Sequence, residues 1–191
     1  ADTADYAEAV NVLSAVGIIE GYNDGTFKPE KTITRAEAIK IVVAALGLPV
    51  TEGNSYPTQF TDVPATAWYS GYVRYGVALG ITDGTSKEHF SPDATVTYDQ
   101  FITFVMRALG YNDSLTGGYP TGYIMQAYQV GVLDKDSETG TAPAPRGDLA
   151  QILYNALDKN FVYYSKDTDS FMAYDGITHS TADNCYDMYD R

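Results

Sequence analysis

The fold is decided by Gly21-Tyr22-Asn23-Asp24-Gly25-Thr26-Phe27, followed shortly afterwards by Thr34-Arg35-Ala36-Glu37. These motifs lie in a segment, residues 17–37, that has an ungapped counterpart at residues 80–100. A third and weaker copy runs over residues 131–148, with a loop about three residues shorter. An apolar stretch ending in Ala-Leu follows each copy. Because self-similarity along a chain is the signature of a repeat protein, three similar units are predicted.

Each unit is predicted to be a helix, a loop and a second helix. Apolar residues recur at helical spacing before Gly17, Gly80 and Gly131, and each glycine supplies a left-handed helix stop. The loops are dense in residues that form turns.

A start signal precedes each second helix. Thr34 with Glu37 has the spacing of a capping box, in which the hydroxyl and the carboxylate each bond a backbone N–H of the other residue. Thr97 with Gln100 repeats the box, and Pro145 takes the threonine position in the third copy. Proline suits a helix start because its φ is fixed.

One such unit cannot bury its own apolar stripe, so the three copies are expected to pack together. Either a three-fold bundle or a short solenoid would bury the apolar stripes. We predict an all-α unit over residues 1–158, with repeat one at 1–48, repeat two at 60–110 and repeat three at 118–158.

Residues 159–191 lack the repeat and carry short runs that favour β structure around turns rich in aspartate. Two interpretations stay open for this tail. It is either a small hairpin packed on the bundle or the start of a following domain.

Composition excludes several functions. The chain has 25 acidic and 12 basic residues, for a net charge of −13. Such a balance argues against nucleic acid and anionic lipid as partners, because phosphates are bound by clustered Lys and Arg. No apolar stretch approaches the roughly twenty residues of a membrane span. We therefore expect no membrane insertion.

The sequence also offers little material for catalysis or metal binding. It has one cysteine and two histidines, and the Asn23-Asp24-Gly25 loop lacks the alternating oxygen ligands of a calcium site. No nucleophile elbow or phosphate-binding glycine loop occurs. We expect no metal, no cofactor and no enzymatic activity.

The quoted motifs resemble those of the S-layer homology family. That family's opening motif appears once in full, as Phe60-Thr61-Asp62-Val63 followed by Trp68. Its Gly-Tyr-x-Asp-Gly-Thr-Phe loop and its Thr-Arg-Ala-Glu box each appear in full once, in copy one at residues 21–27 and 34–37. The resemblance covers about residues 1–158.

The resemblance implies a pseudo-three-fold spindle around a central helical bundle. It further implies that wall polysaccharide, often with a pyruvylated amino sugar, binds in grooves between neighbouring repeats. The box arginine, Arg35, is the expected partner of the ligand's negative charge. Arg146 occupies this position in copy three and Tyr98 occupies it in copy two, so at most two grooves keep an arginine.

Alternatives remain for each candidate. Arg35 lies at a helix N-terminus, where N–H groups favour an anion and a guanidinium can bind a carboxylate through two hydrogen bonds. Otherwise it is a solvated arginine or pairs with a carboxylate of a neighbouring repeat. Tyr98 can stack on a sugar or donate a hydrogen bond. Trp68 is a sugar platform or a core anchor, and Asp62 contacts ligand or caps the helix that follows. Tyr22 joins the candidates because a tyrosine ring has an apolar face and a polar tip.

From this sequence we predict an extracellular module that anchors a secreted protein to the bacterial cell wall by binding wall polysaccharide non-covalently. The alternative is a surface-layer assembly protein whose repeats contact other protein copies and bind no glycan.

Overall fold

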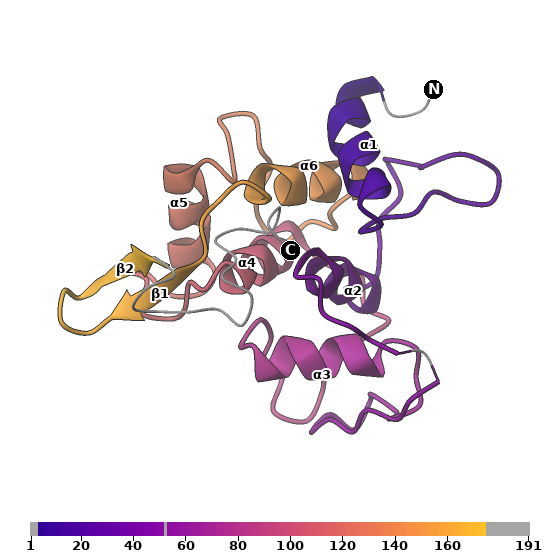
Figure 1. Ribbon diagram of the computed structural model, residues 1–191, viewed down its shortest axis with the longest axis horizontal. Helices are drawn as coiled ribbons and strands as arrows, with labels where there is room; N and C mark the ends of the chain where they lie inside the picture. Colours follow the sequence, from indigo (N-terminus) through magenta and orange to yellow (C-terminus); the bar gives the residue numbers. More distant parts are fainter. Residues whose placement is uncertain (1–3, 52, 175–191) are drawn as a thin grey trace.

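The computed structural model describes residues 4–51 and 53–174. Three inner helices surround the centre of the molecule: α2 (Arg35–Ala45), α4 (Tyr98–Ala108) and α6 (Arg146–Ala156). Three outer helices lie outside them (Figure 1): α1 (Ala7–Ala15), which follows a short 3-10 turn at Ala4–Tyr6, α3 (Ser70–Ala78) and α5 (Thr121–Val130). This arrangement confirms the predicted all-α class and the helix-loop-helix repeat.

Each outer helix packs mainly against the inner helix of the preceding copy rather than that of its own copy. Thus α3 packs on α2, α5 packs on α4, and α1 at the beginning of the chain packs on α6 near its end. The third contact closes a ring. Of the two packing modes that the sequence allows, the structure therefore adopts the closed three-fold bundle and not the solenoid.

The inner helices begin where the sequence predicts. Thr34 and Glu37 form a complete capping box, with the threonine hydroxyl 3.2 Å from the Glu37 amide nitrogen and the carboxylate 2.7 Å from the Thr34 amide nitrogen. Thr97 and Gln100 form a second one. Pro145, which has no N–H to offer, precedes α6 in extended conformation.

The three segments before the inner helices are joined by backbone hydrogen bonds. Isolated β-bridges pair Thr34 with Thr95, Thr97 with Pro143, and Thr32 with Pro145. The first two amides of each inner helix donate to carbonyls of another copy, at 2.8–3.2 Å. In α2 the amides of Arg35 and Ala36 donate to Ala94 and Pro92, and in α4 those of Tyr98 and Asp99 donate to Ala142 and Gly140. In α6 the amides of Arg146 and Gly147 donate to Lys31 and Pro29. We call this set the cap ring. It ties every copy to both of the others.

The core lies between the inner helices and under the outer ones. Fully buried side chains include Leu13 of α1, Val42 of α2, Phe101 and Val105 of α4, and Leu153 of α6. Two apolar residues at the ends of outer helices, Val16 and Leu79, are exposed although their spacing places them on the apolar stripe.

The tail contains a hairpin of β1 (Val162–Ser165) and β2 (Ser170–Ala173). The amide of Val162 donates to the carbonyl of Leu109 at 2.8 Å, and the ring of Phe171 lies 4.9 Å from that of Tyr111. The hairpin is thus packed on the end of α4. Residues 175–191 lie outside the described residues, so the domain limits and a following domain stay predictions.

The α1–α6 contact should be essential to stability, since it closes the ring. Replacing buried Leu13 by Ala should lower the free energy of unfolding by about 2–5 kcal/mol, through lost burial and the cavity left behind. Val16→Ala, at the exposed end of the same helix, should cost less than about 0.5 kcal/mol. Urea denaturation measures both. Equal unfolding midpoints for the two variants would contradict an essential closure.

Candidate functional site

Two grooves occupy equivalent positions between neighbouring repeats. Groove one has a volume of about 540 Å³ and is bounded by residues 17–22, the outward face of α2, Trp68 and Tyr72 before and on α3, and Arg146 of α6. Groove two, of about 340 Å³, is bounded by residues 82–85, the outward face of α4, Tyr119 before α5, and Arg35 of α2. Each groove therefore contains one arginine from the start of an inner helix and one aromatic residue from the segment before an outer helix.

Arg35 lies at the base of groove two with only 3% of its surface exposed. Its Nε donates to the carbonyl oxygen of Phe90 at 2.9 Å, and the guanidinium lies over the rings of Phe90 and Phe104. Its Nη2 has no hydrogen-bond partner among the described residues. Burial lowers the pKa of Arg35 to about 10, against the opposing influence of Tyr119 and Asp62. The side chain is thus a buried cation at neutral pH with one donor unused.

Arg146 holds the corresponding place in groove one. Its Nη2 donates to the carbonyl oxygen of Glu20 at 2.9 Å, and its guanidinium lies over the rings of Tyr22 and Phe27. Its Nε is buried without a partner among the described residues. This side chain is half-buried, so it is more accessible than Arg35.

The amides at the start of α2 are not available to an anion, contrary to the sequence-based expectation. The cap ring engages the backbone N–H groups of Arg35 and Ala36 with the carbonyls of Ala94 and Pro92. The same holds for the first two amides of α6. The anion-binding capacity of these two helix starts therefore lies in the side chains of Arg35 and Arg146 and not in the first backbone amides.

The third position is closed by side-chain contacts. Tyr98 takes the arginine place there and is 7% exposed, and its hydroxyl donates to the carboxylate of Asp148. Tyr6 donates to the other oxygen of that carboxylate at 2.7 Å. Both tyrosine pKa values are raised, that of Tyr98 by burial and then by Asp148, and that of Tyr6 by Asp148 and then by burial. The Tyr98 hydroxyl is therefore engaged within the protein.

Of the two interpretations of Trp68, the core anchor is wrong, because the side chain lies outside the core. It is 53% exposed on the wall of groove one, edge-on to Tyr69, with the Nζ of Lys40 5.9 Å from its ring centre. The reason is its position before α3, on the side that faces α2 across the groove rather than the bundle.

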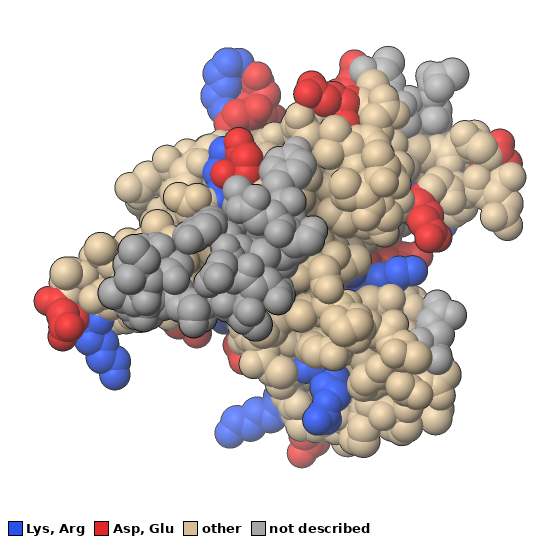
Figure 2. Space-filling model, viewed as in Figure 1, with Lys and Arg blue, Asp and Glu red and all other residues tan. Residues whose placement is uncertain are grey.

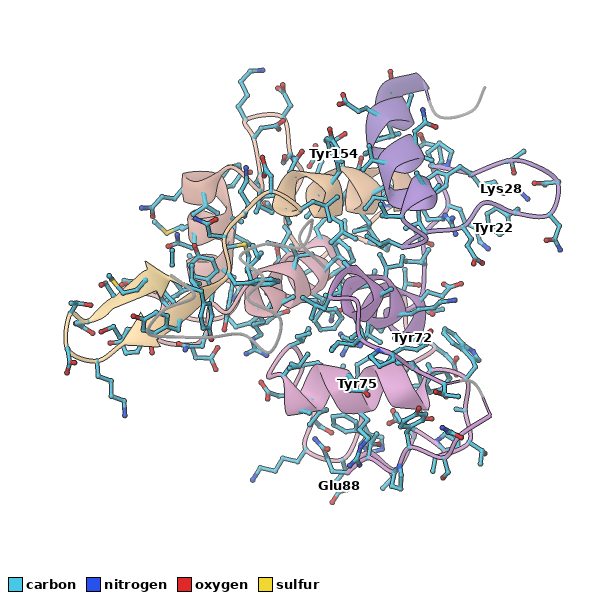
Figure 3. All side chains as sticks on the ribbon, viewed as in Figure 1. Tyr22, Lys28, Tyr72, Tyr75, Glu88 and Tyr154 are labelled. Atoms are coloured by element: carbon cyan, nitrogen blue, oxygen red, sulfur yellow. The ribbon has the colours of Figure 1, made fainter. Side chains whose placement is uncertain are left out.

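Tyr22 lies on the loop of copy one beside groove one, and Figure 3 shows it on that loop together with Lys28. Three cationic groups lie close to its ring. The distances to the ring centre are 4.4 Å for Lys28 Nζ, 4.9 Å for Lys31 Nζ and 4.9 Å for the guanidinium carbon of Arg146. The structure therefore brings Tyr22, Trp68 and Arg146 together, and separates them from Arg35 in groove two.

Asp62 is used for structure. Its two oxygens accept hydrogen bonds from the amides of Phe90 at 2.9 Å and Ser91 at 2.7 Å. It caps this loop rather than the entry of the helix that follows it, and so holds Phe90 beneath Arg35.

Sequence reasoning missed Lys40, Tyr72, Arg107 and Tyr119, which also line the grooves. A signal for Tyr119 exists, because Tyr119-Pro-Thr-Gly-Tyr123 parallels Trp68-Tyr-Ser-Gly-Tyr72. Tyr119 is 55% exposed, close to the value for Trp68. Lys40 and Arg107 carry no such signal, because the equivalent positions of the other copy hold Thr103 and Ala44.

Charged side chains of both signs are interspersed over the face in Figure 2, with a basic one in the recess between the upper and lower parts of the molecule at the right. Among the described residues, no three His, Cys, Asp or Glu side chains converge to hold a metal ion. No helix in the described part of the chain has the length and apolarity needed to cross a membrane.

Comparison with known proteins identifies one family. The family model of the S-layer homology domain matches residues 1–39 and 59–102. The Middle cell wall protein of Brevibacillus brevis is 36% identical over 155 residues, which is 81% of this chain and 15% of that protein. The Cell surface protein of Thermoanaerobacter kivui is 34% identical over 165 residues, 85% of this chain and 21% of that protein. The Surface layer protein of Brevibacillus choshinensis is 35% identical over 126 residues, 65% of this chain and 11% of that protein. The chain thus spans about a fifth or less of the length of each.

The Tyr98–Asp148–Tyr6 cluster predicts a loss of stability in alkali. Because both hydroxyls are held protonated in the folded state, their contribution is fully present below the unfolded tyrosine pKa of about 10. It is lost as pH rises beyond that value, since the unfolded chain then releases protons that the folded chain retains.

Tyr98→Phe should lower the free energy of unfolding at pH 8 by about 1.5–3 kcal/mol, the usual worth of a hydrogen bond to a charged group. It should also make the decline between pH 9.5 and 11 shallower, as measured by urea denaturation at several pH values. Tyr128→Phe, which removes an exposed hydroxyl bonded to the Ser137 carbonyl, is the control. Identical alkaline profiles for Tyr98→Phe and wild type would show that the cluster does not stabilise the fold.

Proposed function

Because this chain belongs to the S-layer homology family, an extracellular family of the bacterial cell surface, we propose that it attaches a secreted protein to the cell wall by binding wall polysaccharide in grooves one and two. The attachment is non-covalent. We further propose that the unit itself catalyses no reaction.

The observation that carries this proposal is a buried guanidinium nitrogen without a hydrogen-bond partner among the described residues, Nη2 of Arg35 in one open groove and Nε of Arg146 in the other. A buried polar group without a hydrogen bond costs about 1–3 kcal/mol, and more when it is charged. A carboxylate in the groove would supply the missing partner. Ligands that bear an acidic substituent, such as a pyruvyl ketal, are therefore favoured over neutral sugars.

Exposed aromatic rings support a sugar rather than a free anion as the ligand. Trp68 and Tyr119 stand at the mouths of grooves one and two, each more than half exposed. An aromatic ring that is apolar on its face and polar at its tip is suited to a sugar, which likewise has apolar and polar parts. Arg35, Arg146, Trp68 and Tyr22 are proposed as ligand contacts, whereas Asp62 and Tyr98 act by shaping the loops and the third position.

Two grooves on one rigid unit also suit a polymeric ligand. When both grooves engage the same chain, the second binding step is intramolecular, and avidity exceeds the affinity of either groove alone. Anchoring can then be firm although each groove makes few contacts.

The alternative is assembly through contacts between copies of the chain, which the name of one relative, the Surface layer protein of Brevibacillus choshinensis, supports. Concentration-dependent association in sedimentation, together with no retention on purified wall sacculi, would favour it.

We expect Arg35→Gln and Arg146→Gln each to reduce retention on purified sacculi, and the double variant to abolish it. Removing one partner of a buried, hydrogen-bonded charge pair costs about 2 kcal/mol or more, so each single change should weaken apparent affinity by at least about tenfold. Co-sedimentation with sacculi over a range of protein concentrations measures the effect.

Arg74→Gln is the matched control, because Arg74 lies on α3 and donates to the Pro57 carbonyl outside both grooves. It should bind like wild type. If the double variant melts like wild type and is still retained, the arginine-centred grooves are not the binding sites.

A further inference from the structure

The two open grooves differ in which of their cations are paired with carboxylates, although they are built from equivalent positions. The sixth residue after the cap threonine lines the groove in both of the first two copies, and it is Lys40 in α2 and Thr103 in α4. Thr103 is buried, and its hydroxyl donates to the backbone oxygen of Asp99 at 2.7 Å. Groove one therefore presents an ammonium group where groove two presents a satisfied hydroxyl.

Lys40 has no carboxylate partner in the described part of the chain. Within residues 4–51 and 53–174, no Asp or Glu oxygen lies within salt-bridge distance of its Nζ, whose described contact is the Trp68 ring. Glu37, one turn earlier on α2, lines the same groove, but its carboxylate is engaged by the amide of Thr34. The charge on Lys40 is thus available to a ligand beside Trp68.

The opposite side of groove one is cationic as well. Arg146 and Lys31 both lie over the ring of Tyr22, and no carboxylate pairs with either of them among the described residues. Groove one, which Glu20 and Glu37 also line, accordingly has two cations without a salt-bridge partner among the described residues, Arg146 beside Tyr22 and Lys40 beside Trp68.

Groove two has its second cation neutralised. Arg107 of α4 lines it, but Nη1 pairs with Asp83 at 2.9 Å and Nη2 pairs with Asp113 at 3.0 Å. Its Nε donates to the Tyr123 hydroxyl at 3.0 Å. Of the two guanidinium groups that line groove two, that of Arg35 has a buried nitrogen, Nη2, without a hydrogen-bond partner among the described residues.

We propose that groove one is specific for a glycan segment with two separate negative charges, one bound by Arg146 and one by Lys40 with a sugar ring facing Trp68, whereas groove two accepts a segment with a single charge. This inference rests on the proposed glycan-binding function and assigns a different ligand chemistry to each groove. Lys40 is the residue that makes the difference.

The test isolates each groove in the full chain. Arg35→Gln leaves groove one intact, Arg146→Gln leaves groove two intact, and Lys40→Gln is added to each. Binding to purified, solubilised wall polysaccharide is measured by titration calorimetry at several NaCl concentrations. Lys87→Gln, which removes the same charge from an exposed loop outside both grooves, controls for net charge.

In the Arg35→Gln background, Lys40→Gln should weaken binding about fivefold at low salt, the effect of losing about 1 kcal/mol from an exposed ion pair. It should also make the salt dependence shallower, because fewer ligand charges are neutralised. In the Arg146→Gln background the same change should have no effect. Lys87→Gln should have none in either.

The outcomes separate the two proposals. If wild-type protein does not bind the polysaccharide, the proposed function fails and this inference fails with it. If wild type binds but Lys40→Gln is silent in the Arg35→Gln background, or equally damaging in both backgrounds, only the two-charge inference is overturned.

Discussion

The rest of the structure depends on the cap ring, in which the first amides of each inner helix donate to carbonyls of another copy. The first backbone N–H groups of any helix have no partner within that helix. Here the capping boxes satisfy some of them and the neighbouring copy satisfies others. A single repeat in isolation would leave these amides to water and its apolar stripe uncovered, so the copies fold as one closed unit.

The same ring determines what kind of site the grooves can be. A helix N-terminus ordinarily binds anions through its exposed amides. Because the amides of Arg35 and Arg146 are engaged, the anion-binding capacity of this position passes to the side chains, which project from the first residue of an inner helix into a groove. Phe90 and Phe27 lie beneath these guanidinium groups and hold them in a partly dehydrated environment, where a carboxylate partner is worth more than in water.

Local features of the sequence predicted local structure well. The capping boxes at Thr34 and Thr97 and the glycine stops at Gly17, Gly80 and Gly131 depend on residues within a few positions of one another, and all are present. The packing of each outer helix on the preceding copy, and the exposure of Trp68, depend on contacts between distant segments that periodicity does not encode. Arg35 and Arg146 could be selected from the motif, but which groove each enters could not, because the arginine of one copy faces the loop of the next.

The third copy differs from the other two at the cap of its inner helix, where Pro145 stands in place of a threonine. Pro145 offers no N–H, so the carboxylate of Asp148, three positions later, has no capping partner there and is bonded instead at the third position. A partly buried carboxylate needs donors, and Tyr98 and Tyr6 supply two. Tyr6 immediately precedes α1, and Asp148 lies on α6, so the contact that fills the third position also fastens the first helix to the last. An arginine at Tyr98 would place its charge against Asp148 instead of a ligand. The contacts that close the third position are therefore also contacts that close the ring of helices.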